Sequence, residues 1–236
     1  MISKLPKWAW IGSGVLAFIA GMINSIGFLG FQHQGITHLT GSTTLFGVAA
    51  ASGDYQAAFH LAGVVGAFFT GCVFGGFLIQ DSTLKLGRRY GVALMIESIL
   101  LLLAVPLLHR QSNFGDYLAS CAMGLQNGMV STYSGAVLRT THLTGVFTDL
   151  GIFIGHRLQG LRVDKRRVRL CLLLLGSFLG GAIVGTIGFA RFSYGTLYFP
   201  AALTGCVGAA YSIYYHRYWK DSQETQPVVQ SSEQAK

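Results

Sequence analysis

Charged residues are scarce in this chain of 236 residues, because Asp, Glu, Lys and Arg together make up only 11% of it. A soluble domain would carry about 25%. Hydrophobic residues account for 51% of the chain, and several apolar stretches reach the length of about 20 residues that a membrane-crossing helix needs. The composition therefore predicts an integral membrane protein and argues against a soluble one.

The sequence also lacks the signatures of common enzyme sites. It contains no H-E-x-x-H, no G-x-S-x-G and no phosphate-binding loop, so we expect neither enzymatic activity nor a cofactor. The four cysteines lie inside apolar stretches without metal-site spacing, and we interpret them as packing residues. The net charge of +8 comes from basic residues that flank apolar stretches, which is typical of membrane loops and does not indicate nucleic-acid binding.

The apolar stretches predict an all-α polytopic helix bundle. We expect one membrane domain over residues 1–220 and a disordered polar tail over 221–236. Six segments are long enough to span a bilayer, and two shorter ones are expected to be re-entrant or half helices. The long segments are 8–31, 56–80, 90–108, 116–137, 168–190 and 195–217, and the short ones are 40–52 and 143–155.

The two short segments begin with nearly the same sequence. HLTGSTTLFG at residues 38–47 returns as HLTGVFTDLG at residues 142–151, with six of ten positions identical. Two further blocks recur in the same order around this motif, which predicts an internal repeat over about 8–110 and 115–218. These blocks are Gly21-x-x-Asn24 with Gly124-x-x-Asn127, and Gly66–Gly75 with Gly176–Gly185.

The distribution of basic residues favours six spans over eight. With six spans and both termini in the cytoplasm, 15 of the 17 Lys and Arg residues lie on the cytoplasmic side. If both short segments crossed, the division would fall to 12 against 5. Because cytoplasmic loops are enriched in Lys and Arg, six spans are favoured, and the two halves then form a 3+3 inverted repeat.

The motif copies supply candidate substrate-binding or coupling residues. Thr40 and Thr144 are expected to cap the short helices, and the glycine after each allows a tight bend. Two helix starts facing a solute near the midplane would make a transporter site, whereas a turn that only satisfies its own backbone is the alternative. The histidines could bind solute, carry a proton or anchor at the interface. The candidates are His38, Thr40, Gly41 and Thr44 in one copy and His142, Thr144, Gly145 and Thr148 in the other.

Polar residues within the predicted spans complete the candidate set. Glu97 and Asp149 are acidic residues inside apolar stretches, where ionisable groups are costly and commonly functional. Each could load and release a proton, or form a structural pair: Asp149 with Arg139 or a histidine, and Glu97 with Asn or Ser neighbours. Asn24, Gln126 and Asn127 could line a cavity or make helix–helix hydrogen bonds. No metal site is expected.

The Gly-x-x-Asn blocks, the Leu-Thr-Gly-x-x-Thr stretch and the Met123–Asn127 stretch resemble the YoaK-like family of bacterial inner-membrane proteins, a domain of unknown function. The resemblance covers about residues 10–217. Members of the family typically show Thr-Gly-Asn in the first half, where this chain has Ser42 after Thr40-Gly41. The resemblance implies a multi-span bacterial inner-membrane protein and no particular substrate.

Together these features predict a small-solute permease in the inner membrane, with its site between the two Leu-Thr-Gly helix starts. A membrane scaffold or partner subunit that transports nothing is the alternative. The expected partners are the lipid bilayer and an unidentified small solute, with no nucleic acid. Assembly into a homo-oligomer stays open.

Overall fold

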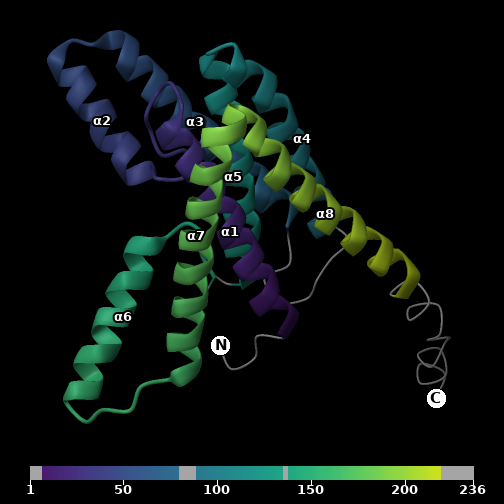
Figure 1. Cartoon of the computed structure of the whole chain (residues 1–236). Coiled ribbons are helices and arrows are strands. Elements are labelled where there is room, and N and C mark those ends of the chain that lie inside the picture. The colour runs from purple at the N-terminus through teal and green to yellow at the C-terminus, as the bar shows by residue number, and fades with distance from the viewer. Residues whose placement is uncertain (1–6, 80–88, 135–137, 219–236) are drawn as a thin grey trace, which may run out of the picture.

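The chain is described by a computed structural model over residues 7–79, 89–134 and 138–218. These residues form eight α-helices and one short 3-10 helix, and they contain no strand (Figure 1). The helices are α1 (Lys7–Leu29), α2 (Leu39–Ser52), α3 (Tyr55–Leu78), α4 (Arg89–His109), α5 (Asn113–Ser134), α6 (Leu143–Leu158), α7 (Lys165–Phe192) and α8 (Tyr198–Tyr218), with η2 (Ser193–Leu197) between the last two.

Each predicted segment corresponds to one helix. The two short segments are α2 and α6, of 14 and 16 residues, so the all-α prediction is confirmed over the described residues. The last long segment was placed from residue 195, but the 3-10 helix occupies its beginning and α8 starts at Tyr198. The predicted tail, 221–236, and most of the basic loop between α3 and α4 lie outside the described residues.

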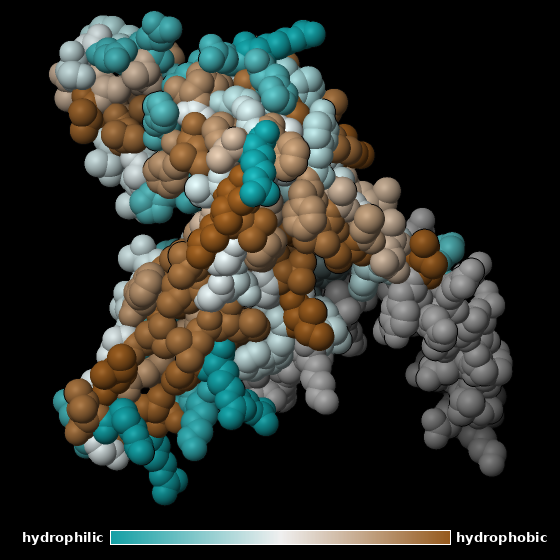
Figure 2. Space-filling model, in the orientation of Figure 1, coloured by the Kyte–Doolittle hydropathy of each residue, from teal (hydrophilic) through white to brown (hydrophobic). Residues whose placement is uncertain are grey.

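Four helical stretches are long and apolar enough to cross a membrane: α1, α3, α4, and one from Lys165 to Ile213 that includes α7 and most of α8. Large apolar side chains cover their outer surfaces, and Phe59, Phe69 and Phe77 of α3 are 68–78% exposed. Figure 2 shows brown, hydrophobic surface running along much of the visible face. These features are consistent with a multi-pass membrane protein.

Helix α5 is long but less apolar than its neighbours, because it lies in the interior of the bundle. Most of its residues are buried, including Asp116 and Gln126. It packs along both α3 and α4. A helix shielded by other helices can carry polar side chains that would be costly if they faced lipid.

Two pairs of helices, α1 with α7 and α3 with α5, make the most extensive contacts. A Cβ atom added to Gly181 of α7 would lie 1.9 Å from the Phe18 carbonyl oxygen, and one added to Gly21 of α1 would lie 2.0 Å from the Phe178 carbonyl oxygen. Only residues without a side chain permit this approach of two backbones. Contacts further along join Gly185 to Met22, so residue numbers rise together and α1 runs parallel to α7.

The second pair repeats this geometry. A Cβ atom on Gly71 of α3 would lie 2.0 Å from the Cys121 carbonyl oxygen, and one on Gly124 of α5 would lie 2.0 Å from the Phe68 carbonyl oxygen. Gly75 approaches Leu125 one turn later, so α3 and α5 are also parallel.

Helices α4 and α8 are antiparallel. The Ser98 hydroxyl of α4 donates a 2.7 Å hydrogen bond to the Ala201 carbonyl of α8, whereas Gly91 of α4 lies against Gly208 of α8. Helix α4 also packs closely along α5, to which it is joined by a short turn. In contrast, α1 and α8 barely touch each other.

The two short helices project from the bundle. Among the described helices, α2 packs only against α3 and α6 only against α7. In Figure 1 the α2–α3 hairpin stands at the upper left and the α6–α7 hairpin at the lower left. The two short helices therefore do not contact each other, because each packs on the helix that follows it. Their N-terminal ends point towards the same level of the molecule, where Figure 2 shows a notch between the two lobes.

Candidate functional site

Both copies of the repeated motif are tied to a preceding helix by an asparagine. The Asn24 Oδ1 atom of α1 accepts hydrogen bonds from the Thr37 hydroxyl at 2.9 Å and from the Thr37 backbone N–H at 3.2 Å. The Asn127 Oδ1 atom of α5 accepts one from the Thr141 hydroxyl at 2.8 Å. Each asparagine thus holds the loop residue just before the motif histidine, which differs from the helix–helix hydrogen bonds considered for these residues.

The motif histidines fold over the motif glycines. A Cβ atom on Gly41 would lie 2.6 Å from His38 Nδ1, and one on Gly145 would lie 2.4 Å from His142 Cδ2. The glycines therefore leave room for the imidazole rings. Both histidines are otherwise exposed, so they remain available to a ligand or to the lipid interface.

The predicted capping role of the motif threonines is wrong. Helix α2 begins at Leu39 and α6 at Leu143, so His38 and His142 occupy the N-cap positions, and neither makes a side-chain cap hydrogen bond. Thr40 and Thr144 lie in the first turns and are exposed. Their carbonyl oxygens accept 2.9 Å hydrogen bonds from the hydroxyls of Thr44 and Thr148, respectively.

Asp149 lies exposed on α6. In the described part of the chain it forms no ion pair with Arg139 or with a histidine, so the structural pair considered for it is absent. An unpaired acidic side chain on a projecting apolar helix would contact either lipid or the water of the notch.

Glu97 is fully buried in α4, and neither of its carboxyl oxygens has a hydrogen-bond partner. The expected pairing with a Ser neighbour does not occur, because the adjacent Ser98 donates to the Ala201 carbonyl instead. A buried carboxyl group without a hydrogen-bond partner is costly, which keeps Glu97 among the candidate functional residues.

Gln126 is fully buried where α5 meets α1. Its amide nitrogen donates to the Leu16 carbonyl of α1 at 3.1 Å and to the Thr140 hydroxyl at 3.0 Å. Gln126 therefore makes helix–helix contacts, the structural alternative considered for it.

A polar cluster that sequence reasoning missed lies near the start of α3 and α5. The side-chain amide of Gln34 is hydrogen-bonded to His60 Nε2, and His60 Nδ1 lies 3.3 Å from the Tyr117 hydroxyl. Asp116 Oδ2 lies 4.0 Å from His60 Nε2 and has no hydrogen-bond partner. Asp116 is an acidic residue at the start of a long apolar segment, and this was the signal in the sequence that could have revealed the cluster.

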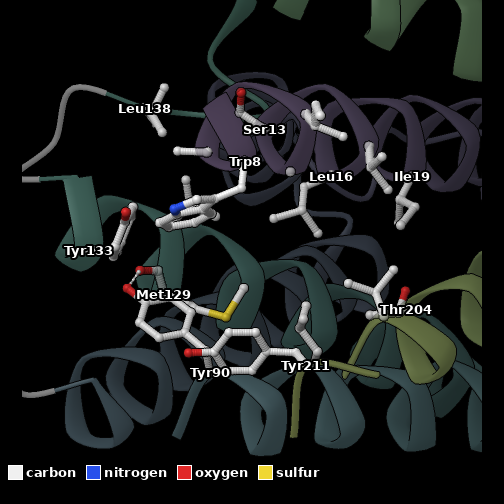
Figure 3. A pocket seen from close by; sticks show the side chains of 17 residues that line it. Trp8, Ser13, Leu16, Ile19, Tyr90, Met129, Tyr133, Leu138, Thr204 and Tyr211 are labelled. Carbon is white, nitrogen blue, oxygen red and sulfur yellow. Dashed lines mark hydrogen bonds between the residues drawn. The ribbon is translucent and has the colours of Figure 1, made fainter. Parts of the chain in front are cut away.

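A cavity of about 330 Å³ opens between α1, α4, α5 and α8. Figure 3 shows Trp8, Tyr90 and Tyr133 at one end and Ile19 and Thr204 at the other. The Trp8 and Tyr133 rings lie 5.3 Å apart between centroids, and Tyr90 and Tyr133 lie 5.2 Å apart. The walls are almost entirely apolar and aromatic, so the cavity suits a solute with apolar or aromatic groups.

The structure separates the predicted candidates into three groups. The first motif copy lies with Asn24, and the second lies with Asn127 and Gln126. Glu97 lies apart from both, at the level of α8 where Thr204 closes the cavity. No hydrogen bond joins the two motif copies in the described ranges, so a site between them would depend on a solute or on water.

A family model described as a protein of unknown function (DUF1275) matches residues 13–210. The chain belongs to the DUF1275 family. The match covers all eight helices of the DUF1275 fold except the ends of α1 and α8. No curated protein and no solved structure matches the chain.

Proposed function

We propose that this DUF1275 protein is a small-solute transporter with six membrane spans in two oppositely oriented halves. It would reside in a bacterial inner membrane with both termini in the cytoplasm, as the resemblance to YoaK-like proteins suggests. The solute would reach Glu97 through the cavity between α1 and α8. The proposal rests on helix direction, on matched contacts in the two halves and on one difference between them.

Helix directions support opposite orientation of the halves. Because α4 is antiparallel to α8 and joined to α5 by a short turn, α5 runs in the same direction as α8. Helix α3 is parallel to α5, and Figure 1 shows α7 rising towards the short 3-10 helix from which α8 descends. Helix α1 is parallel to α7, so α1 and α3 run in opposite directions. This pattern supports short helices that do not cross the membrane, and it favours six spans over eight.

Matched contacts support the repeat. Gly21 and Gly181 join α1 to α7 as Gly124 and Gly71 join α5 to α3. The Asn24–Thr37 hydrogen bonds likewise have a counterpart between α5 and the second motif. Equivalent residues therefore make equivalent contacts in both halves, as expected for halves related by an approximate twofold axis in the membrane plane.

The unequal packing of α4–α5 and α1–α8 is the observation that carries the transporter proposal. The counterpart of the close α4–α5 interface is the α1–α8 interface, which is open and contains the cavity. A Cβ atom added to Gly115 of α5 would lie 2.6 Å from the Leu108 side chain, whereas one added to its counterpart Gly12 of α1 would have no neighbour within 4 Å. If the α1–α8 interface closed while the α4–α5 interface opened, the cavity would close on one side of the membrane and a matching one would open on the other. This exchange is alternating access.

Glu97 is suited to couple this exchange to protons. It follows Leu94, which lines the cavity, by about one helical turn. An unpaired charge in such surroundings costs several kcal/mol. A proton held on Glu97 in the closed state and released when water reaches it would link solute movement to a proton gradient.

Distances between spin labels in liposomes test this mechanism. One pair, Ile11→Cys with Ile213→Cys, measures the distance between α1 and α8 at the mouth of the cavity. Another pair, Leu103→Cys with Phe114→Cys, measures the distance between α4 and α5. All four side chains are exposed, and the native cysteines are replaced. We expect two distances in each pair, with populations that change in opposite senses between acidic and alkaline pH.

A third pair provides the control. Phe69→Cys with Phe114→Cys joins α3 to α5 across their glycine contact and should keep a single distance. Single distances in all three pairs at every pH and with every solute tried would exclude alternating access. The chain would then be the non-transporting scaffold considered above.

A further inference from the structure

A groove between α6 and α7 differs in character from the cavity between α1 and α8. Its volume is about 690 Å³, and it lies between the two arms of the projecting hairpin. Arg157, Lys165 and Arg169 line it together with apolar residues that include Leu150, Phe153 and Leu172. The arms are less closely packed than those of the α2–α3 hairpin, which leaves this groove open.

The basic lining residues lie towards the loop end of the groove, where Leu158 and Val163 also line it, whereas the deep end is lined by apolar residues. Arg157 is in the last turn of α6 and Lys165 is the first residue of α7, so the basic residues gather at the loop end of the hairpin. Leu150 and Phe153 lie one to two turns deeper on α6, and Leu172 lies deeper on α7. Figure 2 shows the same gradient, with teal surface at the lower tip and brown surface above it along α6 and α7.

The charge at the loop end is strongly positive. Residues 157–169 contain six basic residues and one acidic residue, Asp164. The Asp164 carboxylate caps α7 by accepting a 2.8 Å hydrogen bond from the Arg166 backbone N–H, so it is directed to the backbone. The three basic residues of the groove itself are exposed.

We propose that this groove binds an anionic phospholipid. The phosphate would lie among Arg157, Lys165 and Arg169, and an acyl chain would run along Phe153 and Leu172. A ligand with negative charge at one end and hydrocarbon at the other matches the gradient of the groove, and basic pockets between membrane helices have this preference. This site is separate from the cavity of the proposed transporter, and its occupancy does not depend on transport.

Native mass spectrometry of the full chain in detergent measures this binding. The probes are dioleoylphosphatidylglycerol, dioleoylphosphatidylcholine and glycerol phosphate, the last of which has the anionic headgroup without acyl chains. We expect dioleoylphosphatidylglycerol to bind with a clearly higher affinity than the other two probes. A variant with Arg157→Gln, Lys165→Gln and Arg169→Gln should bind phosphatidylglycerol roughly a hundredfold more weakly, since each basic residue near an anionic lipid contributes about fivefold.

A second variant keeps the charge and fills the groove. Leu172→Trp places a larger side chain on the groove wall, where Leu172 is 54% exposed, and should weaken phosphatidylglycerol binding at least tenfold. The matched control, Arg110→Gln with Arg191→Gln, removes basic residues outside this loop and should change nothing. Thermal unfolding of each variant checks that it is folded.

Three outcomes would overturn the proposal. Equal binding of phosphatidylglycerol and phosphatidylcholine would remove the role of charge. Normal binding by Leu172→Trp would place the lipid on the exposed basic loop and leave the groove unused. A change in oligomeric state of Leu172→Trp without a change in lipid binding would mean that a second copy of the chain occupies the groove.

Discussion

Replacing Gly181 by Ala tests whether the α1–α7 contact determines stability. The added Cβ atom would lie 1.9 Å from the Phe18 carbonyl oxygen. Because carbon and oxygen atoms in such contacts stay about 3.3 Å apart, the two backbones would have to separate by more than about 1 Å. Overpacking of this kind costs about 1–3 kcal/mol.

Gly180→Ala is the matched control, because its Cβ atom would meet only the Phe18 ring at 3.9 Å. Both substitutions gain the same helix propensity, about 1 kcal/mol, so their difference isolates the steric cost. A difference of about 1–3 kcal/mol corresponds to a midpoint of thermal unfolding lower by about 3–10 °C for Gly181→Ala.

The midpoints can be measured by the loss of the monodisperse gel-filtration peak after heating in detergent. The same comparison on α3 sets Gly71→Ala against Gly66→Ala, which has no neighbour within 4 Å. Equal midpoints within both pairs would show that the helices separate without cost, and the glycine contacts would then not determine the packing.

Replacing Asn24 by Ala should lower the free energy of unfolding by about 1–3 kcal/mol, because two donors of Thr37 lose their acceptor; unchanged detergent stability would contradict this. In a chain without native cysteines, Gln111→Cys should react with an impermeant thiol reagent only in intact cells, and Leu161→Cys only in inverted vesicles. Labelling of both from one side would exclude opposite orientation of the halves. Glu97→Gln should leave the melting temperature within a few degrees, since its oxygens have no partner, but it should abolish pH-dependent changes in the spin-label distances; a large loss of stability would instead indicate a structural role.

The sequence was sufficient to locate the helices, because their apolar stretches are separated by polar or glycine-containing turns. It also identified α2 and α6 as short helices, since the turns on either side of each apolar stretch limit its length. The ends of the helices were predicted less accurately. Helix α7 begins at Lys165, three residues before the predicted start, because Asp164 caps a first turn made of basic residues. The predicted segment 116–137 corresponds to α5, which is not among the stretches apolar enough to cross a membrane, since it carries polar residues that its neighbours bury.

The contacts between distant residues could not be predicted from one sequence. Asp116 and Gln34 are far apart in the chain. The packing of α5 beside α3 brings Asp116 to His60, and the segment between α1 and α2 brings Gln34 there. The repeated motif was recognised, but its threonines were assigned to the caps because Thr is a common N-cap residue, whereas the N-cap positions lie two residues earlier, at His38 and His142. The partner of each motif, an asparagine on the preceding helix, depends on a loop whose path the sequence does not specify.

The pairing of α1 with α7 also has a consequence for biosynthesis. Helix α1 ends at Leu29, but its principal partner is complete only at Phe192. At a synthesis rate of about 5–20 residues per second, α1 waits about 10–30 s in the membrane before α7 emerges. Its glycine face would be exposed to lipid or to an insertion factor during that time. A chain truncated before α7 would leave α1 without this partner, so the first half should be recognised by membrane proteases when it is made alone.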